Sequence, residues 1–130
     1  MIFVDSSVWV DYFNGNATDQ TELLHDLLGC EPLVIGDIVL AEVLQGFRHD
    51  RDFKVAQELL SSLRIVNVLN TEIALQSAKN FRLLRKLGIT VRKTLDSIIA
   101  TYCISNRLFL LHSDRDFEPF EEHLGLKVVS

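Results

Sequence analysis

Short apolar runs alternate with longer amphipathic stretches along the whole chain. The short runs are mostly β-branched or aromatic, as in strands buried on both faces, and cover residues 2–4, 33–35, 65–68, 109–111 and 127–129. The longer stretches have helical spacing and cover residues 7–13, 21–28, 38–47, 52–63, 71–87 and 95–105. Strands that alternate with helices pair in parallel through right-handed crossovers. The pattern predicts an α/β fold, a three-layer helix-sheet-helix sandwich with a mostly parallel sheet.

Composition adds the expectation of one domain, residues 1–130. Hydrophobic residues make up 48% of the chain and charged residues 24%, the balance of a compact globular unit. Only 6 Gly and 2 Pro occur, with no repeat or low-complexity run that would mark a linker. Cys30 and Cys103 lie in apolar stretches and lack the spacing of a metal knuckle or a disulfide framework. We expect both cysteines to be free, reduced and buried.

The start of the chain and its charge bear on where it acts and on what. Met1 to Asp5 contains no basic leader, and no later stretch approaches the roughly 20 uncharged residues of a membrane span, so we expect a cytoplasmic protein. The net charge of -5 argues weakly against nonspecific binding along a polyanion. It does not exclude a nuclease, because divalent cations bound by carboxylates would offset this charge.

Two aspartates directly follow predicted strands. Asp5 follows the first strand and Asp114 follows the fourth. Taken alone, Asp5 is better explained as a helix cap, and Asp114 also fits a turn or a cap. Ligands of open parallel sheets, however, bind beyond the carboxyl ends of the strands. Two acids at the same edge therefore indicate a site.

Two further acids lie on predicted helices among apolar residues. Glu42 follows Ile38 and Val39 by one turn, which fits a solvated helix edge as well as a site. Asp96 lies on a helix that is apolar nearly all round, which predicts burial. An unpaired buried carboxylate is costly, so Asp96 must be capped, paired or bound to a cation. The alternative for Asp96 is a first-turn residue satisfied by backbone N–H groups.

One acidic metal site explains Asp5, Glu42, Asp96 and Asp114 together. Hard divalent cations prefer carboxylate oxygen and water, and the sequence has no His or Cys cluster for zinc. We therefore expect Mg2+ or Mn2+ as the cofactor.

Five segments of the chain are similar to those of a known family: IFVDSSVW (2–9), IVLAEV (38–43), LDSIIA (95–100), SDRDF (113–117) and GLKVV (125–129). Together they resemble the PIN-domain ribonucleases, and more closely the VapC-type toxins of toxin-antitoxin pairs. No single segment is specific, but the ordered set at this length is, and it spans essentially the whole chain. Asp5, Glu42, Asp96 and Asp114 match the metal-site acids of the family. Asp116 looks like the additional acid that some members carry, and Ser6 matches the polar position beside the first acid.

The resemblance implies hydrolysis of RNA by water at one or two metal ions, leaving a 5'-phosphate and a 3'-hydroxyl. Asp5 would be the central ligand, with Glu42 and Asp96 completing the coordination directly or through water. Asp114 and Asp116 would form the outer part. Acids gathered in this way repel each other, so without metal at least one carboxyl pKa should rise.

Basic residues that could hold RNA are densest just before Asp96. We expect Arg82, Arg92 and Lys93 to contact phosphates, whereas Arg85 and Lys86 fit a solvated helix end at least as well.

Two other features are not assigned to chemistry. Trp9, Tyr12 and Phe13 have helical spacing that favours core packing or an interface over base stacking. His112 is not assigned as a base, since it lies at a strand end and the metal mechanism needs no imidazole.

Partners follow from the resemblance alone. It implies an RNA substrate, a homodimer, and a cognate antitoxin encoded beside the toxin, whose tail covers the acidic cleft. The apolar middle around Leu44, Phe47, Phe53 and Leu59 is either an interface or core.

Three other functions stay open. A phosphatase with a strand-end aspartate nucleophile generally needs a second Asp two residues later and a Lys near the last acids. Here position 7 is Ser7, and we expect no Lys close to Asp114. A housekeeping PIN nuclease in RNA processing is the second alternative. The third is a non-cutting PIN-like module that binds RNA or a partner, which the presence of all four acids disfavours.

Overall fold

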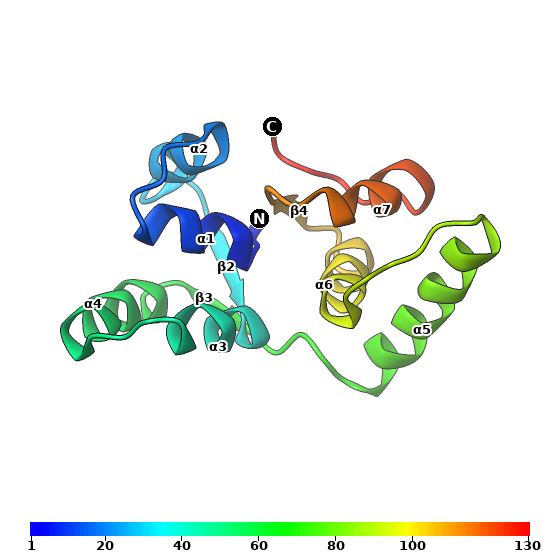
Figure 1. Cartoon of the computed structure of the whole chain (residues 1–130), viewed down its shortest axis with the longest axis horizontal. Helices are drawn as coiled ribbons and strands as arrows, with labels where there is room; N and C mark the ends of the chain where they lie inside the picture. The colour runs from blue at the N-terminus through cyan, green and yellow to red at the C-terminus, as the bar shows by residue number, and fades with distance from the viewer.

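The computed structural model describes residues 1–130 as one sheet with helices on both sides (Figure 1). The elements in chain order are β1 (Ile2–Val4), α1 (Ser6–Phe13), α2 (Asp19–Leu27), β2 (Leu33–Gly36), α3 (Asp37–Gln45), α4 (Asp50–Ser61), β3 (Arg64–Val66), α5 (Thr71–Lys86), α6 (Thr94–Ser105), β4 (Phe109–Leu111), a 3-10 turn η1 (Arg115–Phe117) and α7 (Glu118–His123).

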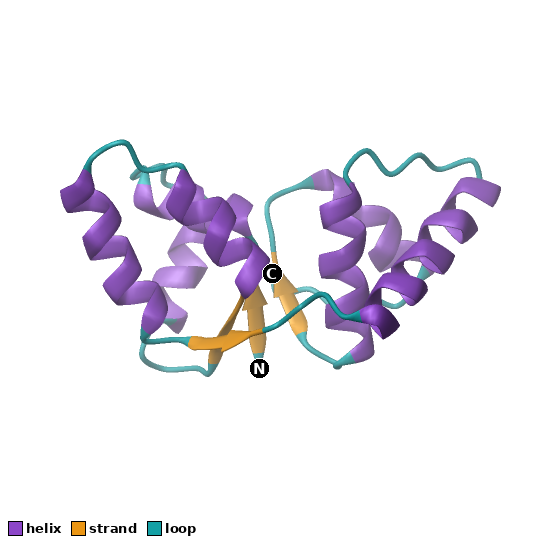
Figure 2. Cartoon of the chain, turned by 90° about the horizontal axis from the view of Figure 1, so that it is seen from below, coloured by secondary structure: helices purple, strands orange, loops and turns teal.

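All four strands are parallel, in the order β3-β2-β1-β4. The chain moves from β1 through β2 to β3 in one direction, and then crosses back from β3 to β4 at the other edge. Because crossovers are right-handed, opposite directions of travel place their helices on opposite faces. Figure 2 shows this result, with α1 to α4 on one side of the sheet and α5 to α7 on the other. The predicted three-layer sandwich is confirmed, with a sheet that is entirely parallel.

The reversal in strand order occurs at β1, which lies between β2 and β4. Phe3 pairs with Val34 on one side and with Leu110 on the other. Just beyond the strands, the Asp5 N–H donates to the Leu111 carbonyl at 3.0 Å. The carboxyl ends of β1 and β4 thus lie side by side at the switch point, where ligands of open parallel sheets bind.

The core behind this edge is tightly packed. Phe3, Trp9 and Ile35 are fully buried. At Gly36, an added Cβ would lie 2.6 Å from Val68 Cγ2 and 2.8 Å from Phe3 Cζ. Only glycine therefore allows the end of β2 to approach these two side chains.

The aromatic residues of α1 belong to this packing. Trp9 stacks on Phe13 with ring centroids 5.9 Å apart, and Phe13 meets Phe47 edge-on at 5.5 Å. The prediction of packing rather than base stacking is confirmed for these rings. Of the apolar residues in the middle of the chain, Leu44, Phe47 and Leu59 pack partly buried against the core, whereas Phe53 is exposed.

Two predicted strands differ from the structure. Residues 65–68 were expected to form a strand buried on both faces, but β3 spans Arg64–Val66 and its first two residues are exposed, because β3 is an edge strand. Val68 is buried beyond its end. Residues 127–129 form no regular strand, since Val128 makes a single parallel bridge with Leu110.

Further differences concern one helix and one cysteine. The six-residue helix α7 was not predicted from the sequence. Cys103 is buried as expected, but Cys30 is exposed, because it lies in the turn that follows α2. No helix has the length and apolar character that crossing a membrane would require.

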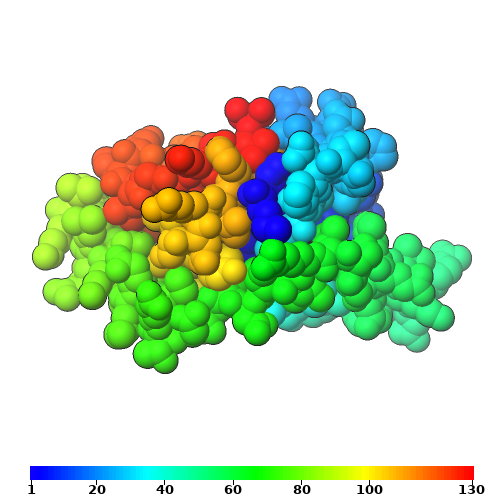
Figure 3. All heavy atoms as spheres, turned by 180° about the vertical axis from the view of Figure 1, so that it is seen from behind, coloured from blue at the N-terminus to red at the C-terminus, as the bar shows by residue number.

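The start of the chain is held between two distant segments. Seen from behind, the blue N-terminal residues lie between the cyan segment that leads into β2 and the orange segment that leads into β4 (Figure 3). The Ile2 N–H donates to the Pro32 carbonyl at 3.2 Å, and the Phe109 N–H donates to the Met1 carbonyl at 3.3 Å.

Candidate active site

An open cleft of about 720 Å³ lies at the carboxyl ends of β1 and β4. Its walls contain every acid that the sequence predicted, together with Ser6. The lining residues are Asp5, Ser6, Ser7, Val10, Asp11, Glu42, Arg92, Lys93, Leu95, Asp96, Ser113, Asp114, Arg115 and Asp116. Among the predicted phosphate contacts, Arg92 and Lys93 line this acidic cleft, whereas Arg82 lies in a separate groove between α5 and α6.

Asp5 connects the end of β1 to the start of α1. It is the N-cap of α1, and its Oδ2 accepts from the Ser7 N–H at 3.1 Å and from Ser7 Oγ at 2.7 Å. Its Oδ1 is buried and has no hydrogen-bond partner. The cap and the site are therefore not alternatives, because each uses one carboxylate oxygen.

Ser7 also ties β1 to the loop after β4. While its hydroxyl donates to Asp5, its oxygen accepts from the Ser113 N–H at 3.2 Å. Ser6, beside the first acid, was predicted from the sequence, whereas Ser7 was not. A short hydroxyl two residues after a strand-end Asp was the available signal, since this spacing favours a side-chain to backbone turn.

Asp96 and Glu42 approach the same space from two helices. Asp96, in the first turn of α6, is 7% exposed, and Glu42 on α3 is half-buried. Asp96 Oδ2 and Glu42 Oε1 are buried without a hydrogen-bond partner. Backbone N–H groups therefore do not satisfy this oxygen of Asp96, and Glu42 is not simply on a solvated helix edge.

Three partnerless oxygens thus belong to residues that line one cleft. The chain has four buried side-chain polar atoms without a partner: Asp5 Oδ1, Glu42 Oε1, Asp96 Oδ2 and Trp9 Nε1. Buried polar atoms are rarely left without a partner, so three such carboxylate oxygens among the residues of one cleft require an explanation. Oxygen donors of this kind fit a hard divalent cation.

A second group of acids lies next to the first. Asp96, Asp114 and Asp116 each offer one oxygen, and these atoms lie within 4.8 Å of one another. Asp114 Oδ1 caps η1 by accepting from the Asp116 N–H at 2.9 Å. Asp96 therefore belongs to this group and is also one of the acids with a partnerless oxygen.

Lys93 balances part of this negative charge. Its Nζ lies 3.4 Å from Asp114 Oδ2, on a side chain that is mostly exposed. The expectation that no Lys lies close to Asp114 was therefore wrong, because Lys93, the extended residue at the start of α6, approaches it. The other argument against a phosphatase still holds, since position 7 carries Ser7.

The pKa values of the acids reflect burial and mutual repulsion. Burial, followed by the charges of Asp5 and Asp114, raises the pKa of Asp96 to about 7. Burial also raises the pKa of Asp5, against the Ser7 hydrogen bonds that favour its ionised form. Burial and then Asp5 raise the pKa of Glu42. The charges of Asp96 and then Asp114 raise the pKa of Lys93. The expected rise in at least one carboxyl pKa is confirmed.

Similar proteins have been described in several bacteria. The chain is 28% identical to a VapC ribonuclease of Mycobacterium bovis and to ribonuclease VapC11 of Mycobacterium tuberculosis, over 100% of this chain and 98% of each relative. Its fold matches the DNA-bound VapBC2 complex of Rickettsia felis with a TM-score of 0.75, at 19% identity over 99% of this chain and 98% of that chain. It matches VapC20 of Mycobacterium tuberculosis, described as a sarcin-ricin loop cleaving toxin, with a TM-score of 0.64, at 17% identity over 91% and 93% of the two chains.

The family assignment comes from the length of the match. The family model described as PIN domain matches residues 2–122, from the start of β1 into α7. The chain belongs to the PIN domain family.

Proposed function

We propose that this chain, acting as a single nuclease domain, is a metal-dependent endoribonuclease and the toxin of a type II toxin-antitoxin pair. The observation that carries the proposal is that three of the acids lining the cleft at the switch point each have a buried carboxylate oxygen without a partner. The VapC ribonucleases that the chain resembles over their full length support the choice of RNA as substrate.

The acids would hold Mg2+ or Mn2+. Asp5 Oδ1, Glu42 Oε1 and Asp96 Oδ2 are the available donors, with Asp114 and Asp116 completing the outer part. When bound, a divalent cation lowers the pKa of its water and stabilises charge that develops on the phosphate.

The remaining groups would orient the acids and the RNA. Ser7 fixes Asp5 by two hydrogen bonds, which leaves Oδ1 directed away from the cap. Ser6 lines the cleft, and its side chain offsets part of the rise in the pKa of Glu42 that burial and Asp5 cause. Arg92 and Lys93 at the cleft would attract the phosphates. Arg82 is not part of this proposal, because it lies in the other groove.

The proposed partners are a cognate antitoxin and a second copy of the chain, in the cytoplasm. Structures with this fold include VapBC complexes from Rickettsia felis and Salmonella typhimurium. An antitoxin segment that carries a cation would complement the acidic cleft.

Incubation of labelled RNA with the purified protein tests the proposal. We expect cleavage with Mn2+ and none after chelation, and Asp5→Ala should abolish cleavage while the protein stays folded. Glu58→Ala is the matched control, since Glu58 is exposed on α4, away from the cleft. Unchanged cleavage by Asp5→Ala would contradict the assignment, and folded wild-type protein that leaves RNA intact would leave only a binding module.

A second experiment separates a toxin from a housekeeping nuclease. Expression in a bacterial host should arrest growth, and the neighbouring open reading frame should relieve the arrest. Growth that continues while RNA is cleaved in vitro would favour the housekeeping function.

A further inference from the structure

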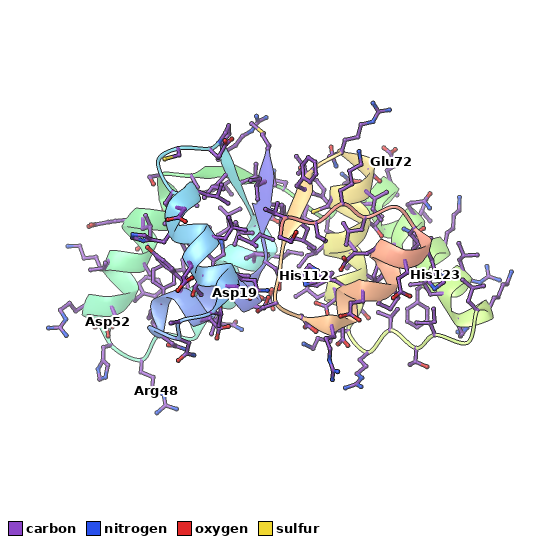
Figure 4. The ribbon with its side chains drawn as sticks, turned by 90° about the horizontal axis from the view of Figure 1, so that it is seen from above. Asp19, Arg48, Asp52, Glu72, His112 and His123 are labelled. Carbon is purple, nitrogen blue, oxygen red and sulfur yellow. The ribbon has the colours of Figure 1, made fainter.

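His112 lies at the end of β4 and makes specific contacts with both of its ring nitrogens. Its Nε2 lies 3.0 Å from Glu121 Oε2, and its Nδ1 accepts from the Asp114 N–H at 3.2 Å. The ring packs on Phe117, with centroids 4.8 Å apart, and the side chain is only 12% exposed. Figure 4 labels His112 between the two groups of helices, near the end of the sheet.

These contacts determine which nitrogen carries the proton. A carboxylate only accepts, so Nε2 must donate to Glu121. Nδ1 is then free to accept from Asp114. Glu121 on α7 therefore holds the imidazole in the one neutral form that can bind the backbone of Asp114.

The turn after β4 has most of its N–H groups bound in this way. Ser7 Oγ accepts from Ser113, His112 Nδ1 accepts from Asp114, and Asp114 Oδ1 accepts from Asp116. The backbone N–H groups of Ser113 and Asp114 are thus held by side chains from two elements, α1 and the end of β4. The carboxylate itself faces the cleft and Lys93.

We propose that His112, oriented by Glu121, is a positioning residue that fixes Asp114 at the mouth of the cleft for cation binding. This inference rests on the proposed function. It assigns no proton transfer to the imidazole, since both ring nitrogens already have partners. It also gives α7 a role in the site, because Glu121 on that helix contacts His112.

Three variants separate positioning from structural support. His112→Phe keeps a ring against Phe117 and removes the acceptor. His112→Asn keeps an acceptor oxygen two residues before the Asp114 N–H, the geometry of an Asx turn. His123→Phe is the matched control, because His123 is a more exposed His on α7, next to Glu122 and away from the turn (Figure 4).

The readout is the Kd for Mn2+, measured by calorimetry on the whole chain without RNA, with Tm measured beside it. We expect His112→Phe to weaken Mn2+ binding by about tenfold, the lower end of the range for partners of metal ligands. His112→Asn should restore most of that loss, and His123→Phe should bind as the wild type does.

Unchanged Mn2+ affinity in His112→Phe would overturn the inference, and so would equal losses in the Phe and Asn variants. If His112→Phe does not fold, Glu121→Leu replaces it, because it keeps the ring and removes its partner. Mn2+ affinity in Glu121→Leu equal to that of the wild type would then count against the role. If the wild type binds Mn2+ but does not cut RNA, the proposed function is contradicted, while the role of His112 in cation binding is still tested by the Kd values.

Discussion

Helix α6 carries two buried polar regions, one with its hydrogen bonds satisfied and one with a carboxylate oxygen left unpaired. Toward α5, Ser97 Oγ lies 3.0 Å from Ser77 Oγ, and Asn80 Nδ2 donates to Thr101 Oγ1 at 3.0 Å. These four residues form a polar seam in which each side chain has a partner. Toward the cleft, the neighbouring Asp96 is about as buried, yet its Oδ2 has no partner.

The difference separates polar groups that stabilise the fold from those that await a ligand. A satisfied buried hydrogen bond contributes about 1 kcal/mol, whereas a buried group without a partner costs about 1–3 kcal/mol. The seam therefore fixes how α5 packs on α6. The acidic cleft destabilises the metal-free fold, as binding sites commonly do.

Replacing Asp96 should have the largest effect, because it should lower RNA cleavage while raising the stability of the metal-free protein. Asp96→Asn keeps the shape and removes a charge that burial, Asp5 and Asp114 all disfavour. We expect RNA cleavage to fall by at least about 100-fold, since a metal ligand matters more than its supporting partners. The metal-free variant should unfold at a higher urea concentration than the wild type.

Ser97→Ala is the control, because it changes the next residue on the same helix. It should lower stability and leave cleavage nearly unchanged. Wild-type cleavage by Asp96→Asn would remove Asp96 from the site.

The seam should respond in the opposite way. Asn80→Ala removes the partner of Thr101 and leaves that buried hydroxyl without a replacement. We expect a loss of about 1–3 kcal/mol in the free energy of unfolding, measured in urea, with no change in Mn2+ affinity.

Removing both hydroxyls of a pair should cost less. The double variant Ser77→Ala with Ser97→Ala leaves no unpaired hydroxyl, so it should be closer to neutral than Asn80→Ala. A double variant that loses more stability than Asn80→Ala would contradict the interpretation of the seam.

The contrast was only partly visible in the sequence. Strands 2–4 and 109–111 were predicted with the observed bounds, because short apolar runs between helical patterns are distinctive. The polar seam was not predicted, since Ser77 and Asn80 look like ordinary exposed polar positions in the sequence. Their burial depends on the packing of α5 on α6. The six-residue helix α7 was missed because Pro119 and three acids interrupt its apolar pattern.

The site, too, could be predicted only in part from the sequence. A strand-end position identifies Asp5 and Asp114 without coordinates. The contact of Lys93 with Asp114 joins residues 21 apart, and the link from Ser113 to Ser7 joins residues 106 apart. Such contacts depend on how the loops close, which periodicity does not specify.

The dependence of stability on pH tests the acidic side of the comparison without RNA or metal. The pKa of Asp96 is about 7 in the folded protein against an ordinary 3.8, so over this interval the unfolded chain has lost a proton that the folded one keeps. Stability of the metal-free protein should therefore fall as the pH rises from about 4 to about 7. The raised pKa values of Asp5 and Glu42 act in the same direction.

Urea unfolding across this interval measures the effect, with Asp96→Asn as the control. The variant should show a shallower decline, and Mn2+ should flatten the decline in the wild type, because the cation favours the ionised acids. Identical pH profiles for the two metal-free proteins would contradict the assigned pKa.

The most direct measurement is an anomalous difference map from a crystal of the protein grown with Mn2+. The account predicts a peak in contact with Asp5 Oδ1, Glu42 Oε1 and Asp96 Oδ2. A map with no peak at the acidic cleft, while those oxygens bond to protein donors, would contradict it.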